Sequence, residues 1–118
     1  MTDHSKEADA VVIQKTYDLL LWIIPQIEKF PRSYRFLLGD RIETKLLEIQ
    51  DNLIEAYYTK QKGEYLKNAN LKCEQVRVLI RLCKDLNIMG IDKYRNVSEK
   101  IDEIGKMIGG WIRTLHLP

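Results

Sequence analysis

The sequence is short of the residues that build most metal, disulfide and membrane sites. Its two cysteines, Cys73 and Cys83, form no CxxC motif, and nothing in the sequence suggests secretion. Its two histidines, His4 and His116, stand near the chain ends, and the absence of HExxH and ExxH patterns argues against the dimetal site of ferritin-like bundles. The longest apolar run, residues 19–24, has six residues, whereas a membrane span needs about 20.

These absences favour a reduced, cytoplasmic protein with no cofactor, no metal and no membrane contact. The N-terminal segment carries acids and lacks a signal-peptide pattern. A chain of 118 residues is expected to form one domain, and 45% hydrophobic with 31% charged residues is typical of a globular protein. The net charge of +2 is a weak indication of nucleic-acid binding by itself.

Two local patterns resemble catalytic motifs, a glycine-rich phosphate loop and a set of paired carboxylates, but neither predicts an enzyme. Gly105, Gly109 and Gly110 lie inside a helical pattern with no strand before them, so they are not a phosphate-binding loop. Gly105 and Gly109 flank the core-facing side of that helix, where we expect them to permit close helix approach. Several acids and lysines of the same helix are expected to form a solvated, ion-paired face: Glu99, Asp102 and Glu103, with Lys100 and Lys106.

Apolar residues recur at helical spacing along the chain, and no segment has the periodicity of a strand. The predicted helices run from about Ala8 to Lys29, from Ser33 or Tyr34 to Gln61, from Glu64 to Leu86 and from Asp92 to Thr114. Residues 1–7 are expected to be a flexible N-terminus, and residues 8–118 the folded domain. Short connections between long helices predict an all-α, up-down-up-down four-helix bundle.

Each predicted helix has one apolar stripe that is expected to face the core. The stripes are Ile13, Tyr17, Leu20, Ile24 and Ile27 on the first helix; Leu38, Ile42, Leu46, Ile49, Leu53, Ala56 and Tyr57 on the second; Leu66, Ala69, Cys73, Val76, Ile80 and Cys83 on the third; and Val97, Ile101, Ile104, Ile108, Trp111 and Leu115 on the fourth.

Prolines and glycines mark the expected bends and ends of these helices. Pro25 cannot donate to the carbonyl of Leu21, which predicts a kink. Pro31 biases the residue before it away from helix and ends the first helix. The sequence KGE at 62–64 is expected to stop the second helix through its glycine. The turn at 87–92 contains Gly90 and a possible cap at Asp92, with Asn96 as an alternative cap.

Two helices carry more apolar residues than one core needs. A second row on the second helix lies about 120–160° from its core stripe, and one on the third helix about 140–180° from its stripe. Together with an outward-facing tryptophan on the first helix, these residues predict a homo-oligomer interface, although a generously wrapped core is the alternative. The interface residues are Trp22, Phe36, Leu47, Ile54, Tyr58, Leu71, Val78 and Leu82.

Basic residues recur near the second connector and along the third helix. Arginine binds phosphate and carboxylate groups through a planar fork, so the set predicts a polyanion-binding surface. For any single residue, solvation or pairing with an acid is the alternative, as for Arg81 with Asp85. The candidate binding residues are Arg32, Arg35, Arg41, Lys45, Arg77, Arg81, Lys84, Arg95 and Arg113.

Three stretches carry a resemblance to a known family. FPRSYRFLLGDRIE at 30–43, LIRLCKDLNIM at 79–89 and DEIGKMIGGWIR at 102–113 resemble the Avd family, the accessory variability determinant proteins of diversity-generating retroelements. The resemblance runs from about Tyr17 to Arg113. Bundles encoded in ribosomal RNA intervening sequences share the fold and look less similar at these stretches.

The resemblance implies more than the periodicity does. It implies a four-helix bundle that assembles as a pentameric barrel and has no catalytic activity. It also implies that the chain binds the retroelement's reverse transcriptase and RNA or DNA, and supports mutagenic copying of a template repeat. Arg32, Arg35 and Arg41 would then repeat around a rim of five protomers. The alternative is a structural bundle of the intervening-sequence type without a nucleic-acid role.

Overall fold

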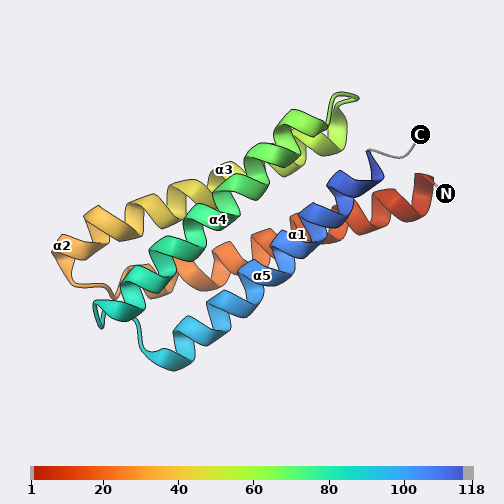
Figure 1. The fold of residues 1–118 in the computed structure, drawn as a ribbon. Coiled ribbons are helices and arrows are strands. Elements are labelled where there is room, and N and C mark those ends of the chain that lie inside the picture. The colour runs from red at the N-terminus through yellow and green to blue at the C-terminus, as the bar shows by residue number, and fades with distance from the viewer. Residues whose placement is uncertain (1, 116–118) are drawn as a thin grey trace.

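The computed structural model describes the backbone of residues 2–115 and the side chains of residues 6–115, and every element in that range is helical. The elements form four rods in a bundle measuring 48 × 22 × 21 Å (Figure 1). The start of α1 (Thr2–Ile27), the end of α5 (Ile91–Thr114) and the connection between α3 (Asp40–Tyr58) and α4 (Gly63–Asp85) lie at one end of the bundle (Figure 1). The other two connections lie at the opposite end (Figure 1). The predicted all-α, up-down-up-down bundle is therefore confirmed for the single chain.

The first rod, α1, spans Thr2–Ile27, so it begins six residues before the predicted start and ends two residues before the predicted end. Its predicted stripe is wrong in part, because Tyr17 and Ile24 are 54% and 38% exposed. The helix is apolar on two sides, so periodicity alone fits more than one stripe. The residues it actually buries are Val12, Thr16, Leu19, Leu20, Ile23 and Ile27.

The second rod is built from three consecutive elements, α2 (Arg32–Tyr34), the π-helix η1 (Arg35–Gly39) and α3 (Asp40–Tyr58). Periodicity predicted one regular helix here and missed the π-helical turn. Gly39 is buried against α1, and a Cβ at this position would stand 2.5 Å from Cγ2 of Ile27. The glycine therefore lets η1 approach the end of α1 more closely than any other residue would.

The second rod ends at Tyr58, three residues before the predicted end, and a lysine rather than a glycine satisfies its last carbonyls. Nζ of Lys62 lies 2.6 Å from the carbonyl oxygen of Ala56 and 2.7 Å from that of Thr59. A cation at this position also suits the negative end of the helix dipole. The predicted glycine stop is wrong, because Gly63 is the first residue of α4 (Gly63–Asp85).

The connection from α4 to α5 (Ile91–Thr114) is a Schellman turn that depends on an asparagine. Asn87 has a φ of 61°, and the N–H of Ile88 bonds the carbonyl of Cys83 at 2.9 Å. Gly90 is the N-cap of α5 in extended backbone, with no side-chain cap. Neither predicted cap is used, since Asp92 and Asn96 both lie inside α5.

The core stripes predicted for the other three rods are largely confirmed. Every predicted residue of α4 is buried, and Trp111 on α5 is 6% exposed. Leu115 is the exception on α5, at 39% exposed. On the second rod the predicted stripe residues between Leu38 and Ala56 are all buried, and Tyr57 is partly buried against the core. Trp22, predicted to face outward, is partly buried against the core as well.

Candidate interaction surfaces

The fold gathers basic residues at the end of the bundle that holds the α1–α2 and α4–α5 connections (Figure 1). We call residues 28–41 and 81–95 the basic end. These two segments carry eight basic and four acidic side chains, a net +4, while the rest of the sequence carries eleven and thirteen, a net −2. The net charge of the chain is therefore unevenly distributed, positive at the basic end and slightly negative over the remainder.

The predicted binding residues of the basic end differ in how freely they are displayed. Arg32, Arg41 and Arg95 are exposed. The guanidinium of Arg35 lies over the ring of Phe36, 5.4 Å from its centroid. Its Nη1 is 3.8 Å from Oε1 of Glu28, which leaves that charge partly satisfied.

The α4 members of the basic end share one acidic neighbour. Nε of Arg81 lies 3.9 Å from Asp85, which confirms the expected pair, and Nζ of Lys84 lies 3.3 Å from the same carboxylate. Lys84 also stands over the ring of Tyr94, 4.9 Å from its centroid. Arg81 remains 74% exposed and so retains access to a ligand.

The remaining predicted residues lie outside the basic end. Lys45 donates from Nζ to Oε1 of Gln75 at 3.0 Å. Arg113 is exposed in the last turn of α5, close to the opposite end of the bundle.

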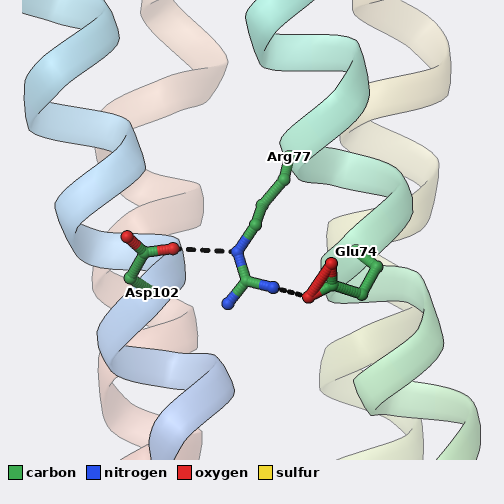
Figure 2. Close-up of polar contacts among 3 residues, drawn as sticks. All are labelled: Glu74, Arg77 and Asp102. Atoms are coloured by element: carbon green, nitrogen blue, oxygen red, sulfur yellow. Dashed lines mark hydrogen bonds and ion pairs between the residues drawn. The ribbon is translucent and has the colours of Figure 1, made fainter.

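Arg77 is held between two carboxylates in the space between α4 and α5 (Figure 2). Its Nε donates to Oδ1 of Asp102 at 2.8 Å, and its Nη1 pairs with Glu74 one turn earlier on α4. The side chain is 32% exposed, so its charge is both paired and largely covered. Arg77 is therefore the least available of the predicted cations.

The expected ion-paired face of α5 exists, but its partners come from other helices. Asp102 pairs with Arg77, and Glu103 pairs with Lys15 of α1 at 3.3 Å. Gly105 makes room for this arrangement, because a Cβ there would stand 2.6 Å from Nη2 of Arg77. The close approach predicted at Gly105 is thus made by a side chain rather than by a helix backbone. At Gly109 the nearest atom to a Cβ would be 3.6 Å away, an ordinary contact.

The second apolar rows predicted on α3 and α4 are exposed. On the second rod Phe36 and Tyr58 are 57% and 81% exposed. The other row members on both helices are exposed as well: Leu47, Ile54, Leu71, Val78 and Leu82. These residues therefore do not pack into the core of the single chain, and the alternative of a generously wrapped core is wrong for them.

A third row, on α1, was not predicted from the sequence, because two of its residues, Tyr17 and Ile24, were expected to face the core. Tyr17, Leu21 and Ile24 are exposed and follow i, i+4, i+7 spacing. They lie about 120–180° around α1 from Lys15, which pairs with α5. The row therefore faces away from α5, along the seam between α1 and α3.

The rows on α3 and α4 do not merge into one face. Lys45, which contacts α4, lies about 160° around α3 from Leu47, so the α3 row borders α1 rather than α4. Exposed polar residues separate the two rows: Thr44, Glu48, Asp51 and Glu55. The chain consequently has two separate apolar surfaces. One is the α1–α3 seam, formed by the α1 and α3 rows; the other is the α4 row of Leu71, Val78 and Leu82.

Neither cysteine has the exposed, readily ionised thiol of a reactive cysteine. Both thiols are buried and free, as expected for core cysteines. Burial raises the pKa of Cys73 to about 11, against a smaller lowering by Arg77, and burial alone raises the pKa of Cys83 to about 11. The side chain of His4 and the whole of His116 lie outside the described residues.

Within the described range, no helix combines the length and the apolarity needed to cross a bilayer. Over the same residues, no three histidine, cysteine, aspartate or glutamate side chains cluster in a way that could hold a metal ion.

Comparisons with known proteins bear on the resemblance drawn from the motifs. Searches of curated proteins and of solved structures found no match. A family model described as bAvd-like matches residues 10–115. This range includes most of α1 and the whole of the other three rods, with the π-helix, the basic end and Arg77 with its acidic partners. Since the match covers most of the sequence and agrees with the quoted motifs, the chain belongs to the bAvd-like family.

Proposed function

We propose that this chain is a non-catalytic accessory protein of a diversity-generating retroelement. It binds the reverse transcriptase and RNA or DNA, and so supports mutagenic copying of a template repeat. Family membership supports the accessory role. The observation that carries the binding role is the basic end, where a net +4 is concentrated on a chain whose remainder is net −2.

The basic end also presents apolar surface, which distinguishes it from a merely solvated patch. Phe36 and Leu37 of η1 are 57% and 61% exposed beside Arg32, Arg35 and Arg41. Arginine with aromatic and aliphatic side chains is typical of protein and nucleic-acid interfaces. We expect nucleic-acid binding to be independent of sequence, because the contacts available are to phosphates.

Three glutamine substitutions at Arg32, Arg35 and Arg41 test this proposal. The variant should lose affinity for single-stranded RNA and pull down less of the cognate reverse transcriptase. Its log–log salt dependence should become shallower by about 0.7 for each phosphate contact removed. The matched control replaces three exposed lysines away from the basic end by glutamine: Lys60, Lys67 and Lys106.

The control decides what a loss means. An equal loss in both variants would indicate a net-charge effect and remove the basic end from the proposal. Unchanged binding of RNA and polymerase in both variants would refute the basic-surface mechanism. The structural bundle without a nucleic-acid role would then replace it.

We also propose that the chain assembles as a homopentamer through its exposed apolar rows. A closed ring needs a heterologous contact, in which two different surfaces of each protomer meet. The α1–α3 seam and the α4 row are two such surfaces on one protomer. The number five comes from the family. Five copies would also repeat the basic end around one rim.

Light scattering of the purified protein should give a mass near five protomers. Substituting glutamate for Ile54 on the seam or for Leu82 on the α4 row should split the assembly and leave helix content intact. Lys106→Glu, at an exposed position of α5 outside both apolar surfaces, is the control that should stay assembled. A wild-type monomer at all concentrations would refute the assembly.

A further inference from the structure

A groove of about 300 Å³ lies between α4 and α5, beside the ion pairs that Arg77 makes with Glu74 and Asp102. Its lining combines two arginines, an aromatic ring and a hydroxyl with two carboxylates: Arg77, Arg81, Tyr94, Ser98, Glu74 and Asp102. Val78 lines it as well, so the groove borders the α4 row. Arginine forks bind phosphate oxygens bidentately, and an aromatic ring offers a stacking surface to any base. These are the groups that sites for single-stranded nucleic acid combine.

The groove leads inward from the basic end. Lys84 of the basic end lies over the ring of Tyr94, which lines the groove, and Arg77 meets Asp102 farther along the same antiparallel helices. Arg81 lies between them on α4. Seven residues separate Lys84 from Arg77, a helical rise of about 10 Å, so three cations follow one line along the groove.

We propose that this groove binds one strand of RNA or DNA, with phosphates at Arg81 and Arg77 and a base against Tyr94. The inference rests on the proposed nucleic-acid function. It adds a path for the strand and a pair of carboxylates that lower the affinity for it. Asp102 and Glu74 already neutralise Arg77 in the free protein (Figure 2). An incoming phosphate therefore competes with these carboxylates for the charge of the guanidinium.

This exchange is energetically accessible. Asp102 is 54% exposed, and an ion pair that reaches solvent contributes little net free energy. Gly105 keeps the space around Nη2 of Arg77 free of a Cβ, so the guanidinium has room to reorient. Asp102 thus acts as an internal competitor that lowers affinity for polyanions without abolishing binding.

The test compares Asp102→Asn with Glu103→Gln in the full chain. Both substitutions remove one negative charge from adjacent, equally exposed positions of α5, but the first releases Arg77 and the second releases Lys15. Binding of a short single-stranded RNA is measured by fluorescence anisotropy at several salt concentrations. Asp102→Asn should bind about two- to fivefold more tightly than Glu103→Gln, the factor that corresponds to an exposed ion pair. Its salt slope should steepen by about 0.7, one added phosphate contact.

A second pair of variants tests the base position independently of charge. Tyr94→Leu should weaken RNA binding about fivefold or more, and Tyr94→Phe should retain it, because stacking needs the ring and not the hydroxyl. Equal affinities for Asp102→Asn and Glu103→Gln, or a Tyr94→Leu affinity equal to wild type, would overturn the groove while the basic end could still bind. An absence of RNA binding by the wild-type protein would overturn both proposals.

Discussion

Replacing Gly39 by alanine should destabilise the protein because of a single contact. The added Cβ would stand 2.5 Å from Cγ2 of Ile27, whose side chain is fully buried. A close-packed neighbour of this kind cannot turn away without moving the core, and such overpacking costs about 1–3 kcal/mol. Alanine in place of glycine in a helix gains at most about 1 kcal/mol. We therefore expect a net loss of about 1 kcal/mol.

Two other glycines provide matched comparisons. A Cβ at Gly63 would have no neighbour within 4 Å, so Gly63→Ala should gain about 0.4–1 kcal/mol by restricting the unfolded chain. A Cβ at Gly105 would meet Nη2 of Arg77 at 2.6 Å, nearly the same distance as at Gly39. The contact is the mobile end of a long side chain, so Gly105→Ala should stay close to wild type. The rigidity of the neighbour, rather than the distance, decides the outcome.

Urea unfolding followed by circular dichroism measures all three variants under one condition. The midpoint should rank Gly63→Ala highest and Gly39→Ala lowest, with similar slopes. A Gly39→Ala midpoint at or above that of Gly63→Ala would show that η1 can shift away from Ile27 at little cost. The close approach of η1 to α1 would then not depend on glycine.

The remaining predictions concern the core, the α4–α5 turn and the buried thiols. Trp111→Ala should cost about 3–5 kcal/mol of unfolding free energy in the same assay, because Trp111 is 6% exposed, and a loss below about 1 kcal/mol would contradict its core position. Asn87→Gly should raise stability by about 0.5–1 kcal/mol and Asn87→Ala should lower it, because φ is 61° there; the opposite ranking would contradict a left-handed turn. Stability should fall between about pH 9 and pH 11, because the thiols of Cys73 and Cys83 ionise near 9.0 when unfolded and near 11 when folded. Urea midpoints measured against pH should show this fall reduced when both cysteines are replaced by alanine, and an equal fall in the two proteins would contradict it.

Sequence reasoning succeeded on α3, α4 and α5, where one apolar stripe is longer than any other apolar row on the same helix. The stripes of α3, α4 and α5 were predictable because a polar or charged side chain on the core side would lose hydration without a partner. It failed on α1, where Tyr17 and Ile24 are as apolar as the residues actually buried. Periodicity measures the spacing of apolar side chains, and on α1 it could not choose between two apolar sides of similar length.

The local irregularities show the same limit. The π-helical turn at Arg35–Gly39 and the lysine that satisfies the end of α3 each depend on a neighbour outside the local pattern. The left-handed residue of the α4–α5 turn is Asn87, although a glycine, Gly90, stands three residues away. An asparagine can adopt that conformation at moderate cost, so composition alone does not locate it.

By itself, the sequence determined the helical class, the four rods, most of the core and the presence of exposed apolar rows, because these follow from the order of polar and apolar residues along the chain. The motifs within it also indicated the family. Only the tertiary structure decided which cations share a surface. Antiparallel packing places Arg41 and Arg95 at one end and Arg113 near the other, while the approach of α5 to α4 neutralises Arg77 with Asp102. Charge is fixed residue by residue, but electrostatic potential depends on distances between residues far apart in the sequence, and those distances exist only once the rods have packed.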